Sequence, residues 1–203
     1  MGFNLFSLQD MIHTKPLKVL IACEFSGTVR EAFSALGHNT WSCDLLPTDI
    51  PGQHYQCDAR TVLHDNWDLI IAHPPCTELA TSGARWWKDK PPHLQEEALD
   101  FVHQLLSAPI PHIALENPVG IISTAIRKPD QIIQPWMFGD EQNKRTCLWL
   151  KNLPLLTATH TCAFPGNKSH YASSGKDQWK VRSKTFRGVA TAMAKQWGQI
   201  LNE

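Results

Sequence analysis

Short apolar runs alternate with segments of helical periodicity along this sequence, and the alternation limits the possible folds more than any other feature. Five runs have the length and branched residues of buried strands, at 17–23, 38–43, 67–73, 111–116 and 145–150. Three segments carry apolar residues at helical spacing, at 28–37, 93–108 and 187–201. The pattern predicts an α/β fold with a mostly parallel sheet, helices on both faces, and a ligand crevice at the carboxyl ends of the strands.

Length and cysteine pattern limit the class of protein. With 203 residues the chain can bury a sizeable core without disulfide bonds, and its six cysteines are scattered with no CxxC pair. The N-terminus lacks the apolar stretch of a signal peptide, and no segment approaches the roughly 20 apolar residues of a membrane-spanning helix. We therefore expect a reduced, cytoplasmic protein with no membrane association.

Charge is distributed unevenly although the net charge is zero. Residues 144–203 carry ten Lys and Arg against two acidic residues, a balance of +8, so the first 143 residues carry −8. Such asymmetry indicates nucleic-acid contact through the C-terminal part, and a solvated basic helix and tail is the alternative. Within this part, residues 155–183 have no clear period and are expected to form a long functional loop or a small subdomain.

Two reactive side chains follow neighbouring strands. Cys76 comes after two prolines at the end of the third apolar run, and the prolines give a stiff turn that can aim the thiol at the crevice. Glu116 ends the fourth run in "ALENP", at the same rim, where it is either a simple cap or a proton donor beside a nucleophile. The pair therefore indicates nucleophilic catalysis assisted by an acid.

Polar residues also end the first strands. Ser26 and Gly27 form a turn that opens a helix, whose amide groups can face a polar ligand or simply begin the helix. Asp44 and Asp58 lie where they can accept hydrogen bonds from a nucleoside, although each alone also suits a turn or a cap. Together these positions predict a nucleotide-like cofactor.

The ordered series "EFSG", Asp44, Asp58, "HPPC", "ENP" and "KRTCLWL" resembles the motifs of the DNA cytosine carbon-5 methyltransferases. The resemblance covers about residues 18–150 and the final helix. It implies a Rossmann-like S-adenosylmethionine-dependent methyltransferase fold, S-adenosylmethionine as cofactor and DNA as partner. It also implies a catalytic domain at 1–154, target recognition at 155–183, and a C-terminal helix at 184–203 that returns to the catalytic domain.

The resemblance implies roles for individual residues. Cys76 would add to carbon-6 of cytosine, Glu116 would hydrogen-bond or protonate ring nitrogen-3, and Arg145 would support the base. Phe25 would stack on the adenine of the cofactor, with Asp44 at its ribose and Asp58 at its amino group. The implied cofactor site comprises Glu24, Phe25, Ser26, Gly27, Asp44, Leu45, Asp58, Pro74, Thr185 and Gly188. The implied substrate site comprises Pro75, Thr77, Ser82, Asn117, Lys168, Lys180 and Arg182.

The sequence departs from the family pattern in three places: the first motif has fewer glycines, Lys144-Arg145 replaces spaced arginines, and only 155–183 is available for target recognition. A separate specificity partner would compensate for the last departure. Four alternatives stay open. The first is methyl transfer to an exocyclic nitrogen, and the second is the same carbon-5 chemistry on RNA or a free nucleotide, or with a modified cofactor. The third is a catalytically silent nucleic-acid-binding module, and the fourth is a metal site around His73 and Cys76. The oligomeric state is not predicted.

Overall fold

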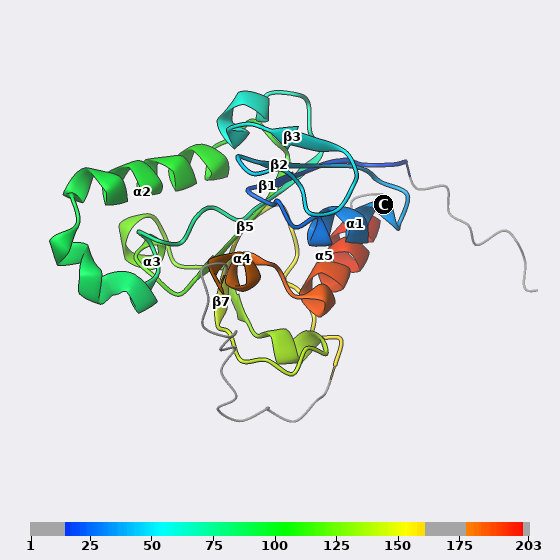
Figure 1. The fold of residues 1–203 in the computed structure, drawn as a ribbon. Coiled ribbons are helices and arrows are strands. Elements are labelled where there is room, and N and C mark those ends of the chain that lie inside the picture. The colour runs from blue at the N-terminus through cyan, green and yellow to red at the C-terminus, as the bar shows by residue number, and fades with distance from the viewer. Residues whose placement is uncertain (1–14, 161–177, 201–203) are drawn as a thin grey trace, which may run out of the picture.

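The computed structural model describes residues 15–160 and 178–200, and a seven-stranded sheet lies at its centre (Figure 1). The strands are β1 Lys18–Ala22, β2 Asn39–Asp44, β3 His54–Gln56, β4 Leu69–Ala72, β5 His112–Pro118, β6 Gln131–Ile133 and β7 Thr146–Lys151. Their order is β3-β2-β1-β4-β5-β7-β6, with β1 to β5 parallel to one another and β7 antiparallel to both β5 and β6. The predicted Rossmann-like fold with a mostly parallel sheet is confirmed.

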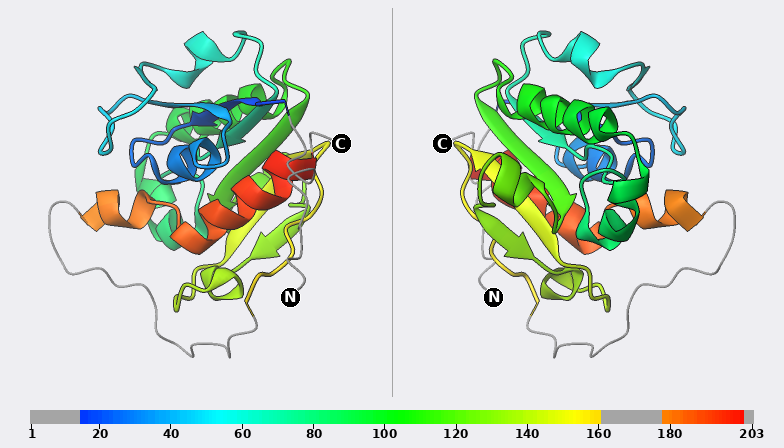
Figure 2. Two further views of the ribbon diagram at one scale, coloured as in Figure 1. Left: turned by 90° about the vertical axis from the view of Figure 1, so that its right-hand side faces the viewer. Right: turned by 90° about the vertical axis from the view of Figure 1, so that its left-hand side faces the viewer.

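Helices cover both faces of the sheet. The helices α1 Thr28–Ser34 and α5 Arg187–Ile200 pack on one face, and α2 Pro92–Leu106 and α3 Ile122–Ala125 lie on the other. Figure 2 shows α5 in front of the sheet in one view and α2 in front of it in the opposite view. Shorter segments are η2 Ala59–Val62, η3 Thr81–Asp89, η4 Pro135–Phe138 and α4 Gln178–Ser183.

Alternation along the strands divides the core into two layers. In β1, Leu20 faces the α2 layer, whereas Val19 and Ile21 face the layer of α1 and α5, and all three are fully buried. Because helices cover both faces, the strand is apolar at every position from Val19 to Ala22 rather than at alternate ones. Trp197 of α5 is also fully buried, and its indole N–H donates to the carbonyl of Pro154 at 3.0 Å.

The five predicted strands and three predicted helices are present, and the elements that the sequence missed are short. The strands β3 and β6 have three residues each and lie at the two edges of the sheet. The end of the segment 155–183 contains α4, whereas residues 161–177 lie outside the described part. In the described residues, no helix is long and apolar enough to cross a membrane.

Candidate active site

Parallel strands bring the predicted residues to one edge of the sheet, where their carboxyl ends meet. A cavity of about 300 Å³ opens there. Two of its walls come from the turn after β1 and the turn after β4, and they include Phe25, Ser26, His73, Cys76 and Thr77. This cavity is the candidate reaction site.

Hydrogen bonds hold the turn that carries Cys76 both before and after this residue. The Cys76 carbonyl accepts the amides of Leu79 at 3.1 Å and Ala80 at 2.9 Å. Across the strands, the side-chain amide of Asn117 donates to the carbonyl of Pro74 at 2.8 Å. Asn117 is only 1% exposed, so it fixes the turn and does not reach the cavity surface. The turn is therefore rigid on both sides of the thiol.

Charges around the cavity act on the thiol in opposite directions. Loss of solvent in the crevice raises the pKa of Cys76, and the Glu116 carboxylate raises it further. The ammonium of Lys144 is the largest influence that lowers the pKa, and Arg182 adds to it. In the free protein the thiol is therefore mostly protonated at neutral pH, and nearby cations favour its ionisation.

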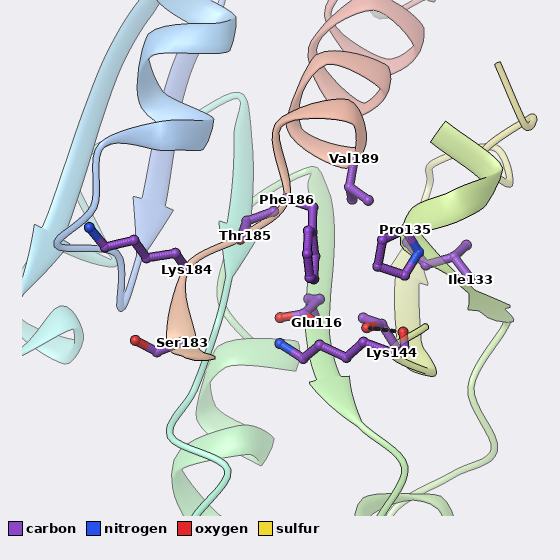
Figure 3. Close-up of a pocket in the computed structure, with 10 residues that line it drawn as sticks. Glu116, Ile133, Pro135, Lys144, Ser183, Lys184, Thr185, Phe186 and Val189 are labelled. Atoms are coloured by element: carbon purple, nitrogen blue, oxygen red, sulfur yellow. Dashed lines mark hydrogen bonds between the residues drawn. The ribbon is translucent and has the colours of Figure 1, made fainter. Parts of the chain in front are cut away.

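Glu116 lies on β5, the strand adjacent to β4, which Cys76 follows, and its side chain is only 16% exposed. His73 Nδ1 is 3.1 Å from Glu116 Oε2, and Figure 3 shows the amino end of Lys144 directed toward the carboxylate. Burial alone would raise the pKa of Glu116. The His73 hydrogen bond, the charge of Lys144 and a hydrogen bond from Thr146 outweigh burial and lower that pKa, so the free protein holds Glu116 as a carboxylate.

The basic residue at this site is Lys144 rather than the predicted Arg145. Lys144 lines a small pocket with Glu116, and its ammonium donates to the carbonyl of Arg182 at 3.2 Å. Arg145 is exposed. Burial raises the pKa of the Cys147 thiol, and the charge of Arg145 partly offsets that rise. Both residues lie directly before β7, where the two side chains have different surroundings.

Glu24 has a structural role that the sequence did not reveal: it caps the N-terminus of α1. Its carboxylate is 4% exposed and accepts the amides of Val29 at 2.7 Å and Arg30 at 3.2 Å, together with the Ser26 hydroxyl at 3.2 Å. These amides belong to the first turn of α1, so Glu24 occupies the helix N-terminus that was expected to face a ligand. Gly27 completes the turn at φ +71°, where a Cβ would come within 2.8 Å of the Arg30 guanidinium.

A second cavity, of about 540 Å³, lies beyond β2 and β3 and is lined by Asp44, Leu45 and Asp58. It shares Cys23, Asp44 and Pro75 with the first cavity. Leu45 is 72% exposed at its rim. Burial raises the pKa of Asp44, and the amide of Leu46 donates to this side chain at 2.9 Å. Together the two cavities form an extended site with volume for a nucleoside and an attached chain.

Asp58 is not free to act as a lone acceptor. It caps η2 through the amide of Arg60 at 2.9 Å and forms a two-pronged ion pair with the Arg60 guanidinium, with Nη2 to Oδ2 at 2.5 Å. The Arg60 hydrogen bond holds the pKa of Asp58 below its usual range. A ligand amino group at this aspartate would share it with Arg60.

The remaining predicted residues divide into those at the cavities and those away from them. Pro75, Thr77 and Thr185 line the reaction cavity, and Thr185 also lines the pocket of Glu116. The exposed Ser82 lies in η3 and lines neither cavity, and Pro74 is buried beneath the turn.

The C-terminal residues show a similar division. The amide of Gly188 donates to Asp140 at 2.9 Å, and a Cβ at Gly188 would lie 2.0 Å from the Phe138 carbonyl, so this glycine allows α5 to pack closely on η4. Lys180 and Arg182 lie on α4, close to Lys144. Lys168 lies outside the described residues.

Sequence reasoning missed the roles of Lys144 and His73. His73 was considered only as a metal ligand, but in the structure it is the hydrogen-bond partner of Glu116. Within residues 15–160 and 178–200, no group of three or more His, Cys, Asp or Glu side chains could hold a metal ion. The detectable signal was the position of His73, directly after a buried strand and next to the Pro-Pro turn.

No family profile matches this sequence, and no curated protein matches it significantly. Among solved structures, a prophage-encoded E. coli protein assigned as a DNA modification methyltransferase aligns with a TM-score of 0.48 and 14% identity, over 66% of this chain and 46% of its own. The Entamoeba histolytica methyltransferase EhMeth gives 0.45 and 14%, over 69% and 54%.

A mutant of DNMT2 from Spodoptera frugiperda gives a TM-score of 0.43 and 15% identity, over 71% of this chain and 54% of its own. The chain thus spans about half the length of these proteins. At these TM-scores and identities the likenesses do not establish an activity.

Proposed function

We propose that this protein transfers a methyl group from S-adenosylmethionine to carbon-5 of cytosine in DNA, through a covalent adduct of Cys76 assisted by Glu116. One observation carries the proposal: the Cys76 thiol, which follows β4, lines a cavity that continues into a second, acid-lined cavity, and the Glu116 carboxylate of the adjacent parallel strand β5 is near enough to raise the pKa of that thiol. A nucleophile, a proton-handling group and a nucleoside-sized site thus share one edge of the sheet.

The two cavities fit the proposed cofactor. Asp44 and Asp58 line the second cavity, where they would accept hydrogen bonds from its ribose and amino group, and the exposed Leu45 would offer an apolar surface to its base. Phe25 and Thr185 line the adjoining cavity toward Cys76. When bound, S-adenosylmethionine supplies an electrophilic methyl group to this chemistry.

Cys76 performs the first chemical step. Carbon-5 of cytosine is a poor nucleophile, so the Cys76 thiolate adds to carbon-6, and the displaced electron pair makes carbon-5 enamine-like. Because Glu116 is a carboxylate in the free protein, it first takes up the proton that leaves the Cys76 thiol and then donates it to ring nitrogen-3, which stabilises this species. After carbon-5 has been methylated, loss of its proton restores the ring double bond and expels the Cys76 thiolate.

Basic residues near the reaction cavity suit a polyanionic substrate. Lys180 and Arg182 lie on α4, and Lys144 and Lys184 line the small pocket of Glu116, where the Lys184 ammonium is also paired with Asp49 at 2.7 Å. We propose that 1–154 forms the catalytic domain, that 155–183 contacts the target, and that 184–203 returns to complete the pocket. A separate specificity partner remains part of the proposal because the contacting segment is short.

Transfer of labelled methyl from S-adenosylmethionine to DNA, followed by nucleoside analysis, tests the proposal directly. The wild-type protein should yield 5-methylcytosine, and Cys76→Ala should yield none while it still binds the cofactor. DNA carrying 5-fluorocytosine should trap a covalent complex with wild type alone, because fluorine cannot leave as the carbon-5 proton does.

Near-normal transfer by Cys76→Ala, or a product methylated on an exocyclic nitrogen, would exclude this mechanism. Cofactor binding without transfer to DNA would favour RNA, a free nucleotide, a modified cofactor or a silent binding module. Affinity for DNA should fall steeply with salt, and Lys180→Ser and Arg182→Ser should each lower the slope of log K against log salt by about 1 if each contacts one phosphate.

A further inference from the structure

His73 is buried and held in place by the sheet. It directly follows β4, and its amide donates to the carbonyl of Ala22 at 2.9 Å, which extends the pairing with β1 by one residue. Its side chain is 7% exposed and lines the reaction cavity. The imidazole therefore has little freedom to change its orientation.

The hydrogen bonds assign the tautomer of this imidazole. Nδ1 lies 3.1 Å from Oε2 of Glu116, and a carboxylate can only accept, so Nδ1 carries a proton. Nε2 is buried and has no hydrogen-bond partner among the described residues. The imidazole thus directs its one satisfied nitrogen at the carboxyl group of Glu116.

We propose that His73 is a positioning residue for Glu116: its Nδ1–H fixes one carboxyl oxygen, and thereby sets the direction in which the other oxygen meets the cytosine ring. This inference rests on the proposed function. General acid–base catalysis depends on such geometry, because a group that handles a ring proton must lie within hydrogen-bond distance of it.

The other groups around Glu116 cannot replace this contact. Titratable neighbours are Lys144 before β7, Cys76 after β4 and Cys147 on β7, and Thr146 contributes only a hydroxyl. Lys144 reaches the carboxylate on a long side chain whose ammonium also donates to the carbonyl of Arg182. Lysine supplies charge without a fixed direction, whereas a planar imidazole at a strand end supplies direction.

Three substitutions of His73 separate the effect of the position of its hydrogen-bond donor from the effect of the size of its side chain. His73→Asn keeps a donor near the place of Nδ1, His73→Gln moves the donor to the place of Nε2, and His73→Leu removes it. We expect kcat for methyl transfer to stay within about threefold in the Asn variant and to fall about ten- to a hundredfold in the other two, because a misplacement of about 1 Å can cost about 10²-fold. KM for S-adenosylmethionine should be unchanged in all three.

A second readout does not depend on turnover. In protein labelled with ¹³C at the glutamate carboxyl groups, the Glu116 resonance is identified by its loss in Glu116→Gln. Its pKa should rise in the Leu and Gln variants and stay low in the Asn variant, because the donated proton stabilises the carboxylate.

The outcomes are distinguishable. An active wild type whose Leu variant keeps both its kcat and its Glu116 pKa would overturn the role of His73. A wild type that transfers no methyl group would overturn the proposed function, and the carboxyl titration would then decide alone whether His73 holds Glu116. Loss of kcat in Leu and Gln with rescue by Asn would establish it.

Discussion

Replacing Glu24 should destabilise the fold, because this buried carboxylate closes the first turn of α1. Glu24→Ala leaves the amides of Val29 and Arg30 without their acceptor, at about 1–3 kcal/mol for each buried donor. The Ser26 hydroxyl loses less because it also lies 3.1 Å from the Thr28 hydroxyl. Since Glu24 borders the reaction cavity, water can reach part of the gap. We therefore expect a loss of about 2–4 kcal/mol.

Glu24→Gln should cost about half as much. One amide oxygen can still accept from Val29, at the shorter of the two distances, but the new NH₂ group faces the Arg30 amide, and two donors cannot pair. At about 2–4 °C of Tm per kcal/mol for a chain of this size, the Ala variant should melt about 4–16 °C below wild type.

Thermal unfolding followed by circular dichroism measures both variants. Glu31→Gln is the matched control, because Glu31 lies in the same helical turn, its side chain is 47% exposed and its ion pair with Arg30 contributes at most about 1 kcal/mol. A Glu24→Ala protein that melts with the Glu31→Gln control would refute the capping role. Unchanged stability with lost cofactor affinity would instead return Glu24 to the ligand site.

Two further predictions concern the ionisation of Cys76 and the close packing of Gly120 against Leu79. Alkylation of Cys76 by iodoacetamide should accelerate as pH rises, because burial raises the pKa of the thiol. At a fixed pH, Lys144→Met should slow alkylation, since Lys144 lowers that pKa, and Glu116→Gln should speed alkylation, since Glu116 raises it. Peptide mass spectrometry measures the rate, and the same direction of change in both variants would contradict the assignment. Gly120→Ala should cost about 1–3 kcal/mol or more in urea unfolding, because the new Cβ would lie 1.9 Å from the Leu79 carbonyl oxygen. Gly83→Ala, where the nearest contact is an ordinary 3.4 Å, should stay within about 0.5 kcal/mol, and equal effects would rule out the clash.

The sequence predicted those elements whose burial pattern is strong. The strands β1, β4, β5 and β7 and the helices α1, α2 and α5 were predicted because each buries several consecutive or regularly spaced apolar residues. The strand β2 was also predicted, although its buried residues are Thr40, Ser42 and Cys43. The edge strands β3 and β6 were missed because three residues are too few to show a period. Their formation depends on pairing with β2 and β7, which is information that a local window does not contain.

Lys144, rather than the predicted Arg145, lies near Glu116, and the sequence failed to predict this for a similar reason. The run "KRTCLWL" predicts a strand but not which of its alternating residues faces which layer, because both layers are apolar. The structure shows that Leu148 belongs to the α1 and α5 layer, whereas Cys147 and Trp149 belong to the α2 layer. Only the antiparallel pairing with β5, which places Leu148 opposite Glu116, determines which residues of β7 face which layer.

Polar residues at the carboxyl ends of parallel strands have two possible uses, and burial separates them. Glu24 and Asn117 are 4% and 1% exposed, and their partners are backbone groups of the turns on either side of the cavity. The Glu24 carboxylate and the side-chain NH₂ group of Asn117 would be costly to leave unpaired, so these two residues build the walls. Cys76 and Asp44 lie at the cavity surface, where a ligand can reach them. A sequence motif contains both kinds of residue without distinction, and for that reason the predicted site was larger than the set of side chains that can meet a substrate.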